Sequence, residues 1–246
     1  MIAATLTVNG TTPPAIGSFG KGVKGARALS FGRSGGRNCP TGCPYHPTST
    51  SDNAAAIGAR CYAARVESRH DRQTLAAKLD RHELTAGDDV LALAALDLDR
   101  HGWRLPWFRF AVFGSVPVKC TTAFRRFTAK LCKAGTPVHL PVFSAEQAAE
   151  YRRGLDGLPV VVRESVPVNE WHAASGAVST VVRHAKQRER VRLAKLAAAT
   201  RQAFTGRRCI VCPATAARFL KTGSDVAKCG ACTACADNVD IVYPAT

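Results

Sequence analysis

The sequence predicts an α/β fold, specifically a partial (open) parallel α/β barrel with a C-terminal cysteine-rich metal-binding module. Two observations predict it. Apolar strands alternate with helical segments between residues 107 and 163, an order typical of parallel strands joined by crossovers. Eight of the ten cysteines fall in two groups towards opposite ends of the 246-residue chain. We therefore expect a basic, glycine-rich segment over 1–38, an α/β core with a cysteine loop over 39–182, and a basic helix with a cysteine module over 183–246.

Hydrophobic periodicity gives the expected elements in chain order. Residues 13–37 are rich in glycine and basic side chains and predict an irregular segment. Apolar residues at helical or alternating spacing then predict the regular elements. Helices are expected over 62–82, 88–101, 121–134, 146–154 and 183–204, and strands over 107–112, 138–143 and 158–163.

The carboxyl ends of the predicted strands are the first place to look for a site, because parallel α/β sheets place functional groups there. Gly114 and Ser115 follow the first strand and are candidate cofactor-binding residues. Ser144 and Glu164 lie at the ends of the next two strands. An ordinary loop role remains the alternative for each of them.

The C-terminal cysteines have the spacing of a four-ligand metal site. Cys209 and Cys212 with Cys229 and Cys232 fit a zinc ribbon. The further Cys235, and the proline directly after Cys212, fit instead a [4Fe–4S] cluster held by Cys212, Cys229, Cys232 and Cys235. Spacing leaves zinc and iron–sulfur both open, and it also leaves open whether Cys209 or Cys235 is the spare thiol.

The N-terminal group has three cysteines, Cys39, Cys43 and Cys61. Three thiolates suit a [4Fe–4S] cluster with one open iron, or a zinc ion whose fourth ligand comes from elsewhere, with His46 as the nearest candidate. An open position can bind substrate or cofactor, so this group predicts the more reactive centre.

Three other chemistry-bearing residues are expected to be structural. Cys120 and Cys132 flank or belong to the predicted helix over 121–134 and are interpreted as small buried hydrophobes. His139 lies inside an apolar strand, where a hydrogen-bonded core residue is expected rather than a catalytic base.

The formal net charge of +16 favours a polyanionic partner through counterion release from phosphates. A general compositional bias towards arginine is the alternative. Basic residues concentrate in the predicted helix over 183–204, which holds one acidic residue, Glu189. A nucleic-acid surface is therefore expected there. Its candidate residues are Arg183, Lys186, Arg188, Arg190, Arg192 and Lys195.

The sequence also predicts a compartment. No stretch approaches the roughly 20 apolar residues of a membrane span, and residues 1–10 lack the basic and apolar regions of a signal peptide. We expect no membrane contact and a cytoplasmic location, where cysteines are thiols or metal ligands rather than disulfides. Nothing in the sequence indicates the oligomeric state.

Several short segments together resemble the "gene product eighty-eight" proteins of phages. They are NCPTGCP at 38–44, CYA at 61–63, FRFAVFGS at 108–115, CPA at 212–214 and CGAC at 229–232. The aromatic residue after Cys61 is similar to radical S-adenosylmethionine proteins, whose three-cysteine [4Fe–4S] cluster binds S-adenosylmethionine on a partial α/β barrel. The resemblance implies Cys39, Cys43 and Cys61 as cluster ligands, and a location in the host cell.

The chain departs from that pattern in two places. Seventeen residues separate Cys43 from Cys61, far more than usual, and Gly114-Ser115 stands where Gly-Asp is expected. The leading hypothesis is an iron–sulfur, radical S-adenosylmethionine-like phage or mobile-element enzyme that acts on or near nucleic acid, with nucleobase modification as a candidate reaction. The alternative is a zinc-stabilised DNA-binding protein of phage replication or regulation.

Overall fold

The computed structural model describes residues 16–18, 27–29, 87–110, 116–183, 186–213, 216 and 234–245. They form an α/β fold with one open sheet in the order β1-β2-β3-β4-β5-β6-β8-β7. The first pair of strands is antiparallel and every other neighbouring pair is parallel. The strands are β1 (Ile16–Ser18), β2 (Arg27–Leu29), β3 (Phe108–Arg109), β4 (Val138–Val142), β5 (Val161–Ser165), β6 (Val178–Arg183), β7 (Cys209–Val211) and β8 (Asp240–Ala245).

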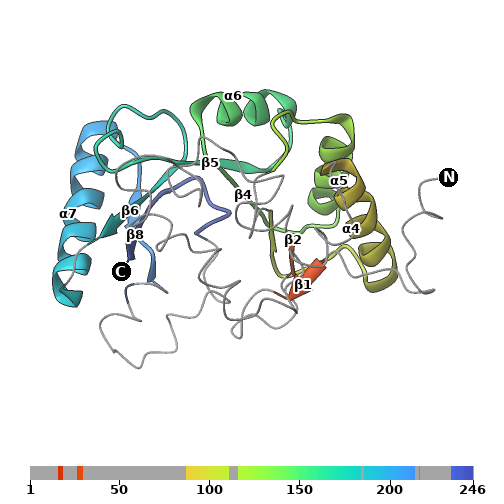
Figure 1. The fold of residues 1–246 in the computed structure, drawn as a ribbon, viewed down its shortest axis with the longest axis horizontal. Coiled ribbons are helices and arrows are strands. Elements are labelled where there is room, and N and C mark those ends of the chain that lie inside the picture. The colour runs from red at the N-terminus through yellow and green to blue at the C-terminus, as the bar shows by residue number, and fades with distance from the viewer. Residues whose placement is uncertain are drawn as a thin grey trace, which may run out of the picture.

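Four described helices accompany the sheet (Figure 1). They are α4 (Gly87–His101), α5 (Thr122–Lys133), α6 (Ala145–Gly154) and α7 (Gln187–Thr205). The alternation of strands and helices between β3 and β5 confirms the predicted α/β class. Local chemistry places three helix ends: the Thr121 and Ser144 hydroxyls accept the amides of Phe124 and Gln147 at the starts of α5 and α6. Gly206 ends α7 in the left-handed region at φ 66°.

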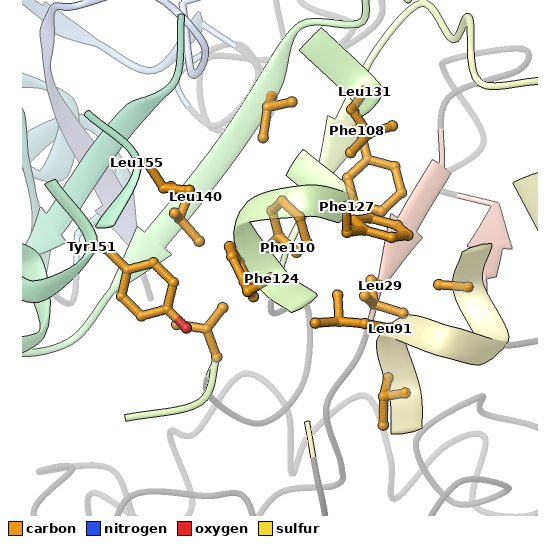
Figure 2. Close-up of a cluster of buried hydrophobic side chains, with 14 of the residues drawn as sticks. Leu29, Leu91, Phe108, Phe110, Phe124, Phe127, Leu131, Leu140, Tyr151 and Leu155 are labelled. Atoms are coloured by element: carbon orange, nitrogen blue, oxygen red, sulfur yellow. The ribbon is translucent and has the colours of Figure 1, made fainter. Parts of the chain in front are cut away.

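The helix face of the sheet buries the larger apolar cluster against α4, α5 and α6 (Figure 2). Phe108, Leu140 and Val162 come from three neighbouring strands, and the register places them on one face. Phe124 of α5 packs on Phe110, with 4.6 Å between ring centroids, and on Tyr151 of α6 at 4.9 Å. Burial of aromatic rings on this scale makes the cluster the main apolar core of the described fold.

A second apolar cluster on the same face packs α7 over β6, β8 and β7. Val178, Val182 and Val242 face Ala194 and Ala198 of the helix. Small alanines bring α7 close to the sheet. Figure 1 shows α7 at one end of the sheet, α6 over the middle, and α4 and α5 at the other end.

The last strand, β8, lies between β6 and β7. The chain therefore leaves the sheet after the edge strand β7 and returns as the strand next to it, parallel to both β6 and β7. β7 and β8 come from 183–246, where a basic helix and a cysteine module were expected, and they belong to the same sheet as the preceding strands. A C-terminal metal-binding module is still a prediction.

Two sequence predictions differ from the described elements, and a third is not tested by them. Arg183 ends β6 rather than starting the basic helix, because the alternating Val178, Thr180 and Val182 are buried against the helices. The segment expected to be irregular contains β1 and β2. The helix expected over 62–82 lies outside the described residues.

Candidate metal centre

The second face of the sheet, opposite the helices, carries polar and ionisable side chains. The strand register places its members: Arg109 pairs with His139, Pro141 with Arg163, Ser165 with Ser179, and Val181 with Tyr243. None of these residues belongs to either described apolar cluster. Several are nevertheless deeply buried, including Arg163 and His139. Buried polar groups need partners, so this face is where chemistry is expected.

Two predicted ligands of the C-terminal group lie at this face. Cys212 follows β7, and its amide donates to the Val242 carbonyl at 2.9 Å. Cys235 lies in the turn before β8, where its Sγ is 3.6 Å from the hydroxyl oxygen of Tyr243. Burial raises the pKa of Cys235, and an electrostatic contribution from Cys212 adds to that rise, so the two side chains lie within electrostatic range of each other. The fold thus brings together two thiols that are 23 residues apart in sequence.

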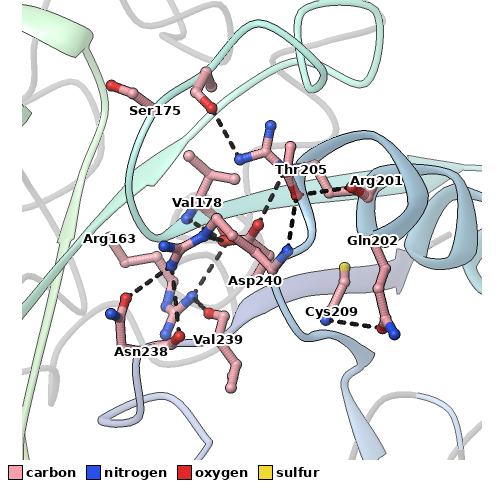
Figure 3. Close-up of polar contacts among 12 residues, drawn as sticks. Arg163, Ser175, Val178, Arg201, Gln202, Thr205, Cys209, Asn238, Val239 and Asp240 are labelled. Carbon is pink, nitrogen blue, oxygen red and sulfur yellow. Dashed lines mark hydrogen bonds and ion pairs between the residues drawn. The ribbon is translucent and has the colours of Figure 1, made fainter.

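Arg163, in the middle of β5, holds the turn that carries Cys235. Its guanidinium donates to the carbonyl oxygens of Asp237 at 2.8 Å, Ala234 at 3.3 Å and Cys235 at 3.4 Å. It also donates to the carbonyl oxygens of Val239 and Val178 in the neighbouring strand region (Figure 3). Five acceptors fix a side chain that has no solvent exposure.

The electrostatics of the site combine burial with positive charge. Burial raises the pKa of the Cys235 thiol, while the Tyr243 hydroxyl and the charges of Arg109 and Arg163 oppose that rise. Burial also raises the pKa of Tyr243 well above 10, and the neighbouring thiolates raise it further. The phenol therefore stays protonated and can donate to a sulfur, and the guanidiniums favour an anion at this place.

His139 is buried, as the sequence predicts, but the predicted hydrogen bonds to its ring are not found among the described residues. Neither ring nitrogen has a hydrogen-bond partner within the described part of the chain. The ring stacks on Trp107 with 5.8 Å between centroids. Burial lowers its pKa well below 6.5, and the charges of Arg109 and Arg163 add to this effect. His139 is therefore a neutral imidazole between two cations, and the expectation of a satisfied core residue was wrong.

These residues fit a thiolate-ligated metal in part. Soft sulfur donors, a protonated phenol and fixed positive charge suit an anionic zinc–thiolate or iron–sulfur group. No group of three or more His, Cys, Asp or Glu side chains placed to hold a metal is found among the described residues. The other predicted ligands, Cys229 and Cys232 with Cys39, Cys43 and Cys61, lie outside those residues, as do Gly114 and Ser115.

Cys209 occupies a different environment from Cys212 and Cys235. It lies in β7 within the second apolar cluster on the helix face, and only 9% of it is exposed. Burial raises the pKa of its thiol to about 12. Of the two candidates for the spare thiol, this placement favours Cys209. The half-buried Cys120 and Cys132 pack against the larger apolar cluster, and burial raises the pKa of each, as for small hydrophobes.

Helix α7 presents three of the six predicted nucleic-acid residues on its solvent side. Arg188, Arg192 and Lys195 are exposed and lie on one helix face at spacings of four and three residues. Lys186 precedes the helix and is exposed, and Arg190 is half-buried. Arg192 forms one ion pair, with Glu189 at 2.8 Å. The buried side of α7 packs on the helix face of the sheet, so this basic surface and the cysteine site lie on opposite faces.

Sequence reasoning missed the residues that shape the site, Arg163 and Tyr243. A charged residue within the valine run of β5 was the available signal for Arg163. Tyr243 carried no signal, because β8 was not expected as a strand. Ser144 proves to be a helix cap, and Glu164 points to the helix face with a pKa raised by burial.

Comparisons with protein-family models, with curated proteins and with solved structures found no match for this chain. Among the described helices, none is long and apolar enough to cross a membrane. The resemblance to the phage family, and every function it implies, stays a prediction.

Proposed function

We propose that the chain is an iron–sulfur protein of radical S-adenosylmethionine type, with a partial-barrel sheet, that acts on or near nucleic acid. In this proposal Cys39, Cys43 and Cys61 hold the reactive [4Fe–4S] cluster, with Gly114 and Ser115 near its cofactor. Cys212, Cys229, Cys232 and Cys235 hold an auxiliary one. The observation that carries it is the meeting of Cys212 and Cys235 beside Tyr243 and Arg163 on the second face.

The surroundings of the two thiols support this assignment. A cluster with four thiolate ligands carries net negative charge, and clusters of this kind supply low-potential electrons when bound. The guanidinium of Arg163 offsets such a charge in a place from which water is excluded. Tyr243 offers its hydroxyl to the sulfur of Cys235. In this proposal Arg163 and Tyr243 orient and neutralise the auxiliary cluster and take no part in the reaction itself.

A metal analysis on anaerobically purified protein tests the proposal. About eight iron and eight sulfide per chain are expected, since each cubane holds about four of each, with a visible band that bleaches on dithionite. Cys212→Ser should retain about half of the iron, and Cys43→Ser should retain the other half. Cys132→Ser is the matched control, because its thiol packs on the apolar core, and it should keep all of the iron. Zinc without sulfide would exclude the iron–sulfur assignment.

A second candidate is a zinc-stabilised DNA-binding protein, and one observation favours it. The exposed cations Arg188, Arg192 and Lys195 lie on one face of α7, across the sheet from the cysteine site. Such a face suits phosphate contact without chemistry. Colourless protein with one or two zinc ions per chain, and with nucleic-acid binding that weakens steeply with salt, would favour this candidate.

A further inference from the structure

We propose that Arg163 and Tyr243 are the positioning residues of the C-terminal metal centre: they fix Cys235 and set how easily the bound cluster is reduced. This inference rests on the proposed iron–sulfur function. It names the part of the second face that would control the auxiliary cluster.

Arg163 ties the Cys235 turn to the sheet. Three of its acceptors, the carbonyl oxygens of Ala234, Cys235 and Asp237, belong to that turn. The other two belong to Val178, the first residue of β6, and to Val239, which directly precedes β8. One side chain therefore sets the position of the Cys235 backbone relative to three parallel strands. The planar fork of an arginine is required for this number of bonds.

No carboxylate in the described part of the chain accepts a hydrogen bond from Arg163. All of its described acceptors are backbone carbonyls, although its side chain is fully buried. Asp240 lies within electrostatic range, but its carboxylate accepts from Arg201 at 3.0 Å and from Arg207 at 3.4 Å. A buried cation without its own anion is costly. Thiolates at Cys235 and Cys212, held in a metal centre, supply that anion.

Tyr243 acts on the sulfur itself. Its hydroxyl is 3.6 Å from Sγ of Cys235, within the range of a hydrogen bond to sulfur. Hydrogen bonds to ligand sulfurs and nearby positive charge both stabilise the reduced, more negative cluster. Arg163 and Tyr243 should therefore shift the reduction potential in the same direction.

The test uses the full-length chain carrying Cys43→Ser, so that one cluster is observed, with iron and sulfide loaded anaerobically. The midpoint potential is followed by EPR during a redox titration. Arg163→Met should weaken one-electron reduction about tenfold, which is about 59 mV more negative. Arg163→Lys keeps the charge and should shift the equilibrium by less than about threefold. Tyr243→Phe should weaken reduction without loss of fold, because its ring remains buried.

Arg201→Lys is the matched control. Arg201 is equally buried, but it lies on the helix face and has its own carboxylate, so the potential should not change. If Arg163→Met fails to fold, Tyr243→Phe still decides the question. Wild-type potentials in Tyr243→Phe and in Arg163→Met, where that variant folds, would overturn this inference and leave the proposed function intact. Wild-type protein without iron would overturn both.

Discussion

Arg163 and Arg201 are both fully buried, but they lie on opposite faces of the sheet and find different partners. On the helix face, Arg201 pairs with the Asp240 carboxylate at 3.0 Å and donates to the carbonyl oxygens of residues 171, 172 and 174. On the second face, the described acceptors of Arg163 are all backbone carbonyl oxygens, and the Cys235 thiol lies within electrostatic range of its guanidinium. The buried guanidinium on the helix face thus has a carboxylate among its hydrogen-bond partners, whereas no described carboxylate accepts a hydrogen bond from Arg163.

The comparison shows that the helix face carries the apolar packing of the described fold, whereas the second face carries its titratable groups. The helix face combines two apolar clusters with one ion-paired network. The second face gathers guanidiniums, thiols, an imidazole and a phenol, and burial shifts the pKa of most of these titrating groups. Groups shifted in this way are typical of functional sites. Substitutions on the helix face should therefore cost stability, and those on the second face should change metal binding or titration.

The largest loss of stability is expected from Asp240→Ala. It removes the carboxylate that accepts from Arg201, Arg207 and the Val178 amide, and it leaves Arg201 buried without an anion. Breaking a buried pair in this way costs about 3–5 kcal/mol in the free energy of unfolding. Urea unfolding measures it. The control is Asp99→Ala, whose ion pair with Lys130 is about half exposed and should contribute far less. Equal losses would remove the distinction between the two pairs.

A comparable loss is expected when the apolar core is emptied. Phe124 is fully buried between Phe110 and Tyr151, so Phe124→Ala should lower the free energy of unfolding by about 3–5 kcal/mol. Phe204 at the end of α7 is 74% exposed, so Phe204→Ala should change the free energy of unfolding by less than about 0.5 kcal/mol. A large effect of Phe204→Ala in urea unfolding would show that this exposed ring is covered by a contact beyond those described.

The same division explains what the sequence could predict. Helix-face strands such as β4 and β5 have apolar runs, and their helices have caps, so the α/β class and most elements between 88 and 165 were predicted within three residues. β6 was missed because its valines run directly into the basic segment that follows, and Arg183 was assigned to the helix. β8 was missed because Asp240 and Pro244 interrupt a short strand that only a parallel neighbour on each side stabilises.

The candidate site was predictable only in its ligands. Cysteine spacing pointed to Cys212 and Cys235, and the fold brings these two together. Arg163 and Tyr243 come from strands 80 residues apart in the chain, so their meeting depends on β8 lying between β6 and β7. That strand order is a tertiary property, and no local spacing encodes it.

A smaller effect, visible only against pH, is expected at His139. The folded state holds it neutral, with a pKa well below 6.5, whereas the unfolded chain protonates it near 6.5. Below that pH the unfolded state binds more protons, so this residue makes stability fall as pH falls, by at most about 1.4 kcal/mol per pH unit. Above it the contribution is constant.

The measurement compares urea unfolding of the wild type and of His139→Phe at pH 7.5 and 5.5. The wild type should lose about 1 kcal/mol more than the variant between these values. At pH 7.5 the variant should be at least as stable, because phenylalanine can stack on Trp107 and leaves no ring nitrogen without a partner. A variant with the wild-type pH dependence would show that His139 is hydrogen-bonded or protonated in the folded protein.

The smallest effect on stability is expected on the solvent side of α7. Substitutions there should separate nucleic-acid binding by the helix from metal binding on the second face of the sheet. Replacing Arg188, Arg192 and Lys195 with glutamine should leave unfolding almost unchanged, because all three are exposed. If they contact phosphates, the slope of log affinity for single- or double-stranded DNA against log salt should become shallower by about 2–3.

The control for this α7 variant replaces Arg104, Arg126 and Lys133, which are exposed at the other end of the sheet. Iron content should stay at the wild-type value in both variants, since α7 lies across the sheet from Cys235. Loss of iron in the α7 variant would mean that the basic helix and the cysteine site are coupled, and the two faces would then have to be treated as one site.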